Sequence, residues 1–259
     1  MVNRRVLVTG ASSGIGAETA VVLARLGWPV VAAARRIERL DDLAEEHQRI
    51  EPWELDVTDD ASVAALAEHL KETGGLEAVV HCAGGAFGLD TVETGKVEDW
   101  QHMYNINVLG ALRVTQAVLP LLRASAAGSS GSRPTKTGDF VFITSVAAHQ
   151  PYKGGAGYVA AKHAERILAT TLRMEILGEP IRVIQIEPGA VETKEFSLNR
   201  FQGDKAKAAA VYAGYDPLVA EDVAETVAWV LSRPPHVNIE HLMIRPLAQG
   251  PNQDIAREP

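Results

Sequence analysis

The chain has 259 residues, 46% of them hydrophobic and 22% charged, so it can bury the core of one large α/β domain. Its formal net charge of −8 argues against a general nucleic-acid binder, which usually carries a basic excess. Because no run approaches the ~20 apolar residues of a membrane helix, we expect neither nucleic acid nor a membrane as a partner.

Short apolar runs alternate with amphipathic stretches along the whole chain. The apolar runs predict strands at 5–10, 29–34, 50–57, 76–84, 139–145, 181–189 and 239–246. The amphipathic stretches predict helices at 17–27, 39–48, 59–73, 97–122 and 157–177, with further helical pieces within 204–231.

This strand–helix rhythm predicts an α/β fold built on a doubly wound parallel sheet, because strands covered on both faces read as continuous apolar runs. No internal repeat interrupts it, so residues 1–259 are expected to form a single domain. The Ser-, Gly- and Pro-rich stretch at about 123–138 predicts a flexible surface loop, and 247–259 a short tail.

The single cysteine, Cys82, cannot form an intrachain disulfide, and this favours a cytoplasmic setting. The apolar stretch near the N-terminus begins at Val6 and reaches a turn at Gly10. It is too short for a signal sequence, and no cleavage-like site follows it.

A glycine-rich turn joins the first predicted strand to the first helix. The segment VLVTGASSGIG contains Gly10, Gly14 and Gly16. Glycine allows close approach of the backbone to a ligand, and the helix N-terminus that follows attracts a diphosphate. The spacing G-x-x-x-G-x-G differs from the usual dinucleotide fingerprint, and alone it is equally compatible with an ordinary strand–helix turn.

The end of the second predicted strand helps to decide between the two. A dinucleotide site places an acidic residue there for the ribose hydroxyl, whereas an arginine accommodates a 2′-phosphate. This chain has Ala34 followed by Arg35 and Arg36. Two guanidiniums without a carboxylate favour NADP(H) over NAD(H); the alternative is that both arginines only decorate a helix surface.

Tyr158 and Lys162 stand four residues apart in YVAAK, on one face of a predicted helix. A nearby ammonium lowers the pKa of a phenol, which can then exchange a proton with an alcohol or a carbonyl. Ser145 ends the fifth predicted strand, where ligands of doubly wound sheets bind. Asn107 lies within the long fourth predicted helix. Because asparagine has a low helix propensity, we expect a specific role for this residue.

Seven stretches together resemble, in order and spacing, the short-chain dehydrogenase/reductase family. They are TGASSGIG (9–16), LDV (55–57), CAG (82–84), NVLG (107–110), ITS (143–145), YVAAK (158–162) and PGAVET (188–193). The resemblance implies a single-domain, Rossmann-like sheet of seven parallel strands flanked by helices. It also implies an enzyme that transfers hydride between an alcohol and NADP(H).

By position, the resemblance implies a catalytic set of four residues. Tyr158 would be the general acid/base, and Ser145 would hydrogen-bond the reacting oxygen. Lys162 would bind the nicotinamide ribose hydroxyls and lower the Tyr pKa. Asn107 would support a water relay behind Lys162.

The resemblance also implies the cofactor site. Asp56 and Val57 would lie by the adenine, and Thr193 with Pro188 near the nicotinamide. The full implied set is Gly10, Ser12, Ser13, Gly14, Ile15, Gly16, Arg35, Arg36, Asp56, Val57, Cys82, Ala83, Gly84, Tyr158, Lys162, Pro188, Gly189, Val191 and Thr193.

One departure concerns His81 and Cys82, which stand where the family often has two asparagines. We expect cofactor binding to be retained, because this stretch contributes mainly backbone. No further ligands stand at a suitable spacing from either residue, so no metal site is predicted. Cys82 is expected to be a buried packing residue.

The segments EFS (195–197), RFQGD (200–204) and PPHVNIEHLMIRP (234–246) resemble the NADP-dependent 3-hydroxy acid dehydrogenase branch, which acts on serine and L-allo-threonine. A substrate carboxylate needs a cation, and Arg200 is a candidate together with Gln150 and Lys153. Ser145 and Tyr158 would complete the substrate site.

Three alternatives remain open. A carbonyl or aldehyde reductase of the clavulanate dehydrogenase type is also similar in ASSGIG, AARR and IRP. A non-catalytic NADP(H)-binding regulator could share the fold, although it would have no need of the four catalytic residues. Arg200 could equally be a solvated or interface residue.

The family implies a homotetramer or homodimer through the helices at 97–122 and 157–177.

Overall fold

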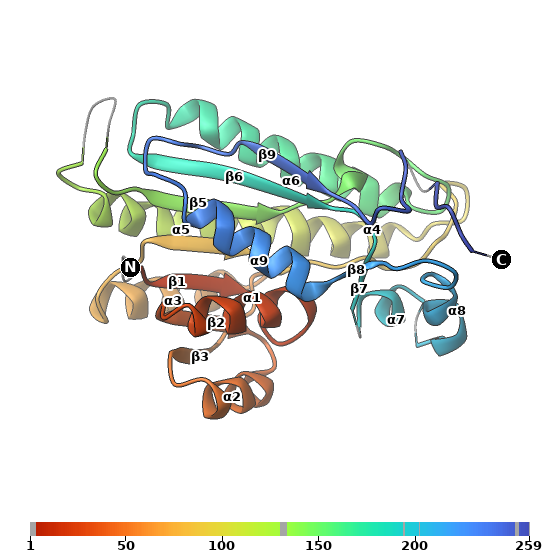
Figure 1. Ribbon diagram of the computed structural model, residues 1–259, viewed down its shortest axis with the longest axis horizontal. Coiled ribbons are helices and arrows are strands. Elements are labelled where there is room, and N and C mark those ends of the chain that lie inside the picture. The colour runs from red at the N-terminus through yellow and green to blue at the C-terminus, as the bar shows by residue number, and fades with distance from the viewer. Residues whose placement is uncertain (1–3, 130–133, 194, 202, 252–253, 259) are drawn as a thin grey trace.

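A computed structural model describes residues 4–129, 134–193, 195–201, 203–251 and 254–258. Its centre is a seven-stranded sheet in the order β3-β2-β1-β4-β5-β6-β9, in which all neighbours are parallel (Figure 1). The predicted fold class is therefore confirmed. The strands are β1 (Val6–Thr9), β2 (Val30–Ala34), β3 (Ile50–Glu54), β4 (Ala78–His81), β5 (Gly138–Ile143), β6 (Ile181–Pro188) and β9 (His241–Ile244).

Alternate side chains of the strands enter two separate cores, one on each face of the sheet. In β1, Val6 and Val8 pack in one core and Leu7 in the other, and all three are fully buried. This two-sided burial is why the strands read as continuous apolar runs.

Helices cover both faces. On the face of Val6 and Val8 lie α1 (Gly14–Arg25), α2 (Ile37–Glu46) and α9 (Ala220–Leu231), and Figure 1 shows α9 beside α1. On the face of Leu7 lie α3 (Asp60–Glu72), α5 (Gly110–Ser125) and α6 (Ala156–Glu175). The sheet is thus flanked by helices, as predicted.

The strand order reverses at β1. From β1 the chain builds outward through β2 and β3, and then returns to place β4 on the other side of β1. The loops that leave the carboxyl ends of these strands diverge, which opens a crevice at the switch point.

The long predicted helix at 97–122 runs from Val97 to Ser125 but is not regular. It comprises α4 (Val97–Tyr104), a π-helical turn η1 (Asn105–Leu109) and α5. By length and mean hydropathy of 1.2 alone, this stretch could cross a membrane, which the sequence analysis did not expect. Much of its apolar surface in α5, however, packs into the core beside the sheet, including Val114, Val118 and Leu122.

Several predicted boundaries were wrong. Strands β3 and β4 end before the predicted limits at 57 and 84, because the chain leaves the sheet to form the crevice. The predicted loop at 123–138 begins inside α5; its residues 130–133 lie outside the described residues. The tail at 247–259 is partly paired, since Gln249 bridges Ile255 and accepts a hydrogen bond from the Ala190 N–H at 2.8 Å.

The region from residue 191 to residue 231 is more divided than predicted. The region 204–231 forms α8 (Lys205–Ala210) and α9, separated by β8 (Leu218–Val219). β8 pairs with β7 (Val191–Glu192), and α7 (Phe196–Arg200) follows β7. A short 3-10 turn, η2 (Val146–Ala148), precedes α6. The pairing of β7 with β8 holds the start of the 193–201 segment beside the crevice.

Candidate active site

A cleft of about 520 Å³ lies at the carboxyl ends of the central strands. Every residue that the sequence analysis assigned to the cofactor lines this cleft. Of the four proposed catalytic residues, Ser145, Tyr158 and Lys162 also line it, whereas Asn107 lies behind the wall. The sequence-predicted residues therefore converge on one site.

The phosphate loop is shaped by two glycines. Gly10 has φ of 69°, in the left-handed region, and a Cβ there would lie 2.8 Å from the Ala83 backbone. A Cβ on Gly16 would lie 2.4 Å from the Gly10 carbonyl oxygen. Only glycine fits both positions, so the loop stays tight and the start of α1 at Gly14 faces the cleft. That helix start favours an anionic diphosphate.

Arg36 is anchored beside the phosphate loop. Its guanidinium donates to Ser12 Oγ at 2.9 Å and to Ser13 Oγ at 3.1 Å. It also pairs with Glu195, at 2.9 Å between Nη2 and Oε2. Arg35 lines the same wall of the cleft. Both arginines therefore lie at the end of β2, the position from which an arginine accommodates a 2′-phosphate in a dinucleotide site.

Glu195 was missed by the sequence analysis. It lines the cleft and forms ion pairs with both Arg36 and Arg39. Partial burial acts to raise the pKa of Glu195, but the hydrogen bonds from the two arginines outweigh it and lower the pKa to about 2. No local signal could have revealed this contact, because about 160 positions separate the partners.

The cleft is also lined by Asp56 and Val57, which follow β3, the strand next to β2. Asp56 Oδ1 accepts hydrogen bonds from the Thr58 N–H at 2.9 Å and the Thr58 hydroxyl at 2.7 Å. Burial acts to raise the pKa of Asp56, and these bonds more than offset it, so the pKa lies below its ordinary value. Asp56 therefore presents a fixed carboxylate to the cleft.

Tyr158 and Lys162 share one face of α6, as their spacing predicts. Lys162 Nζ lies 6.0 Å from the centroid of the Tyr158 ring and donates to the Ile143 carbonyl at 3.0 Å. It also forms an ion pair with Glu165 Oε2 at 2.6 Å. Burial acts to lower the pKa of Lys162, but Glu165 and Tyr158 outweigh it, so the pKa is raised and the ammonium persists.

Ser145 is held at the start of η2. Its Oγ accepts a hydrogen bond from the Ala147 N–H at 3.1 Å and donates to the Pro188 carbonyl at 3.5 Å. The second contact is long, at the limit of a hydrogen bond, so the hydroxyl can turn to a substrate oxygen. The end of β5 thus presents the serine to the cleft, as predicted.

Asn107 lies in the π-helical turn and is fully buried. Its Nδ2 donates to the carbonyls of Gly85 at 2.9 Å and Met103 at 2.7 Å, and its Oδ1 accepts from the Gly85 N–H at 3.2 Å. A Cβ on Gly84 would lie 2.5 Å from Oδ1 and 3.7 Å from Lys162 Nζ. The π turn therefore places Asn107 behind the lysine and clamps the 84–85 backbone; such turns are frequent at functional sites.

Comparison with known proteins decides the family. The model of the short chain dehydrogenase family matches residues 4–202. The chain belongs to this family. Members are oxidoreductases that act on CH–OH groups with NAD(P), so the predicted family and enzyme class are confirmed.

Three similar proteins illustrate the relationship. An uncharacterized oxidoreductase of Mycobacterium tuberculosis is 49% identical over 247 residues, which cover 95% of this chain and 92% of that protein. The NADP-dependent 3-hydroxy acid dehydrogenase of Schizosaccharomyces pombe is 35% identical over 262 residues, covering 98% and 97%. A solved structure, the closed form of serine dehydrogenase complexed with NADP⁺, superposes with a TM-score of 0.89 at 35% identity, covering 98% and 100%.

In this short-chain dehydrogenase, His81 lies in the core, whereas Cys82 packs against the core but is only partly buried and lines the cleft, so the expectation that it is buried was wrong. His81 is buried against Phe142, with ring centroids 4.5 Å apart, and burial lowers its pKa to about 3. Burial also raises the pKa of Cys82 to about 12, so the thiol stays protonated. The N–H groups of Cys82 and Ala83 both donate to Thr9 Oγ1 at 3.2 Å. The Thr9 hydroxyl therefore holds the backbone of residues 82 and 83 by hydrogen bonds.

Of the predicted substrate residues, Ser145 and Tyr158 line the cleft. Arg200 donates to the Tyr152 hydroxyl at 2.7 Å, and its guanidinium carbon is 6.0 Å from the centroid of the Tyr158 ring. Gln150 lies in the loop between η2 and α6. Neither Arg200 nor Gln150 is among the described residues that line the cleft. Phe196 does line it, edge-on to Tyr158 at 5.8 Å between centroids.

Other lining residues were not predicted. Asn199 reaches the cleft from α7, and Phe87 from the segment after β4. Tyr152, the partner of Arg200, was also missed; burial raises its pKa, although Arg200 opposes the shift. These residues stand in segments whose conformation no periodic pattern predicts.

Proposed function

We propose that this short-chain dehydrogenase uses NADP(H) to interconvert a secondary alcohol and a carbonyl in a 3-hydroxy acid or β-hydroxy amino acid, of the serine or L-allo-threonine type. The observation that carries the substrate class is Arg200. Its Nε is buried and has no hydrogen-bond partner among the described residues, although the guanidinium lies beside the Tyr158 ring. A substrate carboxylate would satisfy that N–H with a charge-assisted bond.

The names of similar proteins support the same class. Serine and 3-hydroxy acids, the substrates named by serine 3-dehydrogenase and 3-hydroxy acid dehydrogenase, both carry a carboxylate on the carbon next to the one that bears the reacting hydroxyl. A guanidinium is the preferred partner for a carboxylate because its fork matches two oxygens.

Arg35 and Arg36 support the choice of NADP(H). Both line the cleft at the end of β2, where an NAD(H) site would offer an acid. The glycine cradle and the helix start described above fit the diphosphate of the same cofactor. The cofactor would therefore lie along the loop from Gly10 to Gly16, with its adenine end near Asp56.

The catalytic residues would divide the work. When bound, the nicotinamide accepts a hydride from the alcohol carbon or returns one to the carbonyl. Tyr158 would take the proton of the substrate hydroxyl, and Ser145 Oγ would hold the same oxygen. Lys162 would hold the ribose hydroxyls and keep a positive charge beside Tyr158. Asn107, behind Lys162, would support the water relay that carries the proton onward.

A substrate panel tests the proposal. Purified protein is mixed with NADP⁺ and serine, L-allo-threonine or a simple 3-hydroxy acid, and with NADPH and uncharged aldehydes, and nicotinamide absorbance is followed. We expect turnover of the carboxylated alcohols. Turnover restricted to aldehydes would instead support the carbonyl reductase alternative. Tight NADP(H) binding without any turnover would support the regulator.

We further propose that the enzyme is a homotetramer or homodimer. Apolar side chains are exposed on α4 and α6, among them Trp100, Tyr104, Ile167 and Met174. Burial of such side chains against a second copy would be favourable. Light scattering on the purified protein should report two or four chains, and Ile167→Glu should lower that number. A monomer at all concentrations would contradict the proposal.

A further inference from the structure

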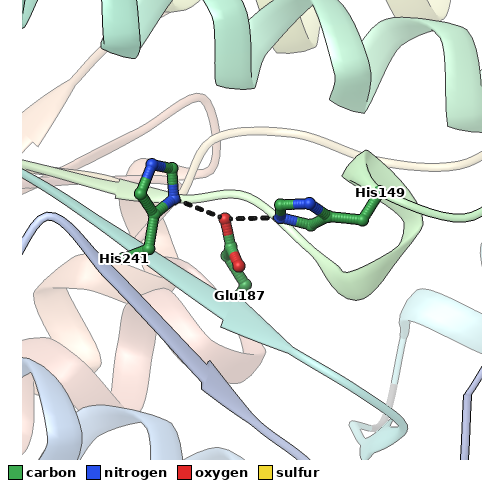
Figure 2. A group of neighbouring side chains, drawn as sticks. All are labelled: His149, Glu187 and His241. Carbon is green, nitrogen blue, oxygen red and sulfur yellow. Dashed lines mark hydrogen bonds and ion pairs between the residues drawn. The ribbon is translucent and has the colours of Figure 1, made fainter.

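His149, Glu187 and His241 converge away from the residues that line the cleft. Figure 2 shows both imidazoles directed at one carboxylate oxygen. His149 Nε2 lies 2.8 Å, and His241 Nδ1 2.9 Å, from Glu187 Oε1. All three potential ligand atoms lie within 4.8 Å of one another. The residues come from three separate segments, namely the loop after η2, strand β6 and strand β9.

Glu187 is unusual for its position. It belongs to β6, all of whose residues are buried, and its own side chain is only 2% exposed. A buried carboxylate is costly unless it is paired or coordinates a metal. The two histidine side chains are 31% and 35% exposed, so the cluster has a buried carboxylate at its base and two imidazoles that solvent can reach.

We propose that His149, Glu187 and His241 bind one divalent transition-metal ion, of which Zn²⁺ is the representative. Two imidazoles and one carboxylate are a donor set that suits zinc, whereas calcium and magnesium prefer oxygen ligands alone. Water would complete a four-coordinate site from the exposed side. To bind the ion, each imidazole would present a deprotonated nitrogen, and a proton on that nitrogen would move to the other ring nitrogen or to solvent.

The movement required is small. Ligand distances of about 2.0–2.1 Å place the donor atoms of a tetrahedral site roughly 3.3 Å apart. The two N–O separations would therefore each grow by about 0.5 Å from the present 2.8 and 2.9 Å, and the two nitrogens, now within 4.8 Å of each other, would settle at a similar separation. Because the imidazoles are half-exposed, they can turn outward while Glu187 stays in β6.

The position of the site gives it a structural consequence. Pro188, the residue after Glu187, lines the cleft, and its carbonyl accepts the hydrogen bond from Ser145. His149 follows Ser145 by four residues. The ion would therefore fasten β9, β6 and the segment that carries Ser145 to one another, just outside the cleft. The sequence analysis predicted no metal site, because these ligands are far apart along the chain.

The test uses the full chain without a histidine tag, stripped with EDTA and titrated with Zn²⁺ in a calorimeter. We expect one ion per chain. His149→Ala and His241→Ala should each weaken binding by more than about tenfold. His236→Ala, which removes an exposed histidine in the loop before β9, is the matched control and should bind as the unchanged protein does.

Two further readouts make the test decisive. Co²⁺ should give visible absorption bands in the unchanged protein and the control, but not in the two variants. Zn²⁺ should raise the thermal midpoint of the unchanged protein and of His236→Ala, but not that of His149→Ala or His241→Ala. Thermal midpoints measured in EDTA show whether every variant is folded. If the variants bind Zn²⁺ as well as the unchanged protein, or the latter takes up less than one ion, the cluster is only a hydrogen-bonded group and the proposal is wrong. Neither outcome depends on the substrate proposed above.

Discussion

Lys162 and Glu165 form an ion pair in the interior of the enzyme, at 2.6 Å between Nζ and Oε2, with the residues only 6% and 1% exposed. The pair lies directly beneath the proposed proton-transfer site. Burial alone would lower the pKa of Lys162, and the carboxylate of Glu165 is the first factor that reverses this effect. Glu165 is therefore expected to act on the proposed reaction through the lysine.

Glu165→Gln should shift the pH dependence of activity. The charge of a lysine with a raised pKa is retained below its ordinary pKa and is lost as pH rises through the raised value. Without the carboxylate, burial lowers the pKa of Lys162, so activity should fall at a lower pH on the alkaline side. Profiles of kcat/KM against pH measure this. Glu175→Gln, exposed on the same helix, should leave the profile unchanged.

An alkaline limb that stays in place in Glu165→Gln would show that the lysine charge does not limit the reaction. A variant that merely loses activity at every pH would indicate a folding defect, and thermal unfolding with circular dichroism separates these two outcomes.

Tyr158→Phe removes the proposed acid/base while leaving the ring that packs against Phe196. Because general acid–base catalysis contributes about 10²–10⁴-fold, kcat should fall by at least about 100-fold. NADPH binding, followed by fluorescence, should persist. Tyr104→Phe, on the exposed face of α4, serves as the control. Near-normal turnover in Tyr158→Phe would remove this residue from the mechanism.

Replacement of Arg35 and Arg36 by alanine should weaken NADP⁺ much more than NAD⁺. A hydrogen bond between charged groups contributes about 1.5–3 kcal/mol, so the loss for NADP⁺ should be roughly tenfold or more. Equal losses for both cofactors in binding titrations would show that the arginines do not contact the 2′-phosphate.

Glu195→Gln should have the opposite effect on NADP⁺ binding to the replacement of Arg35 and Arg36. Its carboxylate, with a pKa of about 2, is ionised at neutral pH and occupies Arg36 and Arg39. A 2′-phosphate would have to share the Arg36 guanidinium with Glu195, so the variant should bind NADP⁺ more tightly and NAD⁺ unchanged. The gain should shrink at high salt, since exposed charges are screened. Weaker NADP⁺ binding in the variant would mean that Glu195 instead helps to hold the arginines in position.

Arg200→Ala should raise KM for carboxylated substrates by about tenfold or more, because it removes the proposed charge-assisted contact. Uncharged carbonyl substrates should keep their KM, and they form the internal control. Arg233→Ala, a change at an arginine in the loop after α9, controls for a general effect of lost positive charge. Unchanged kinetics on the acids would assign Arg200 to packing against Tyr152.

Much of the fold and of the candidate site could be predicted from the hydrophobic pattern and the spacing of residues in the sequence. The strand runs could be read because each strand is buried on both faces, and Gly10, Ser145, Tyr158 and Lys162 could be placed because each stands at a strand end or on a regular helix. Glu165 was within reach of the same reasoning, since three residues along a helix bring it to the face of Lys162.

The tertiary structure alone decided the rest. The pair of Arg36 and Glu195, the contact of Arg200 with Tyr152, and the cluster of His149, Glu187 and His241 all join segments that are distant in the chain. The interruption of the long helix at Asn107 likewise depends on what packs around it. Sequence periodicity reports which face of an element is buried, whereas contacts between elements depend on how loops close in space.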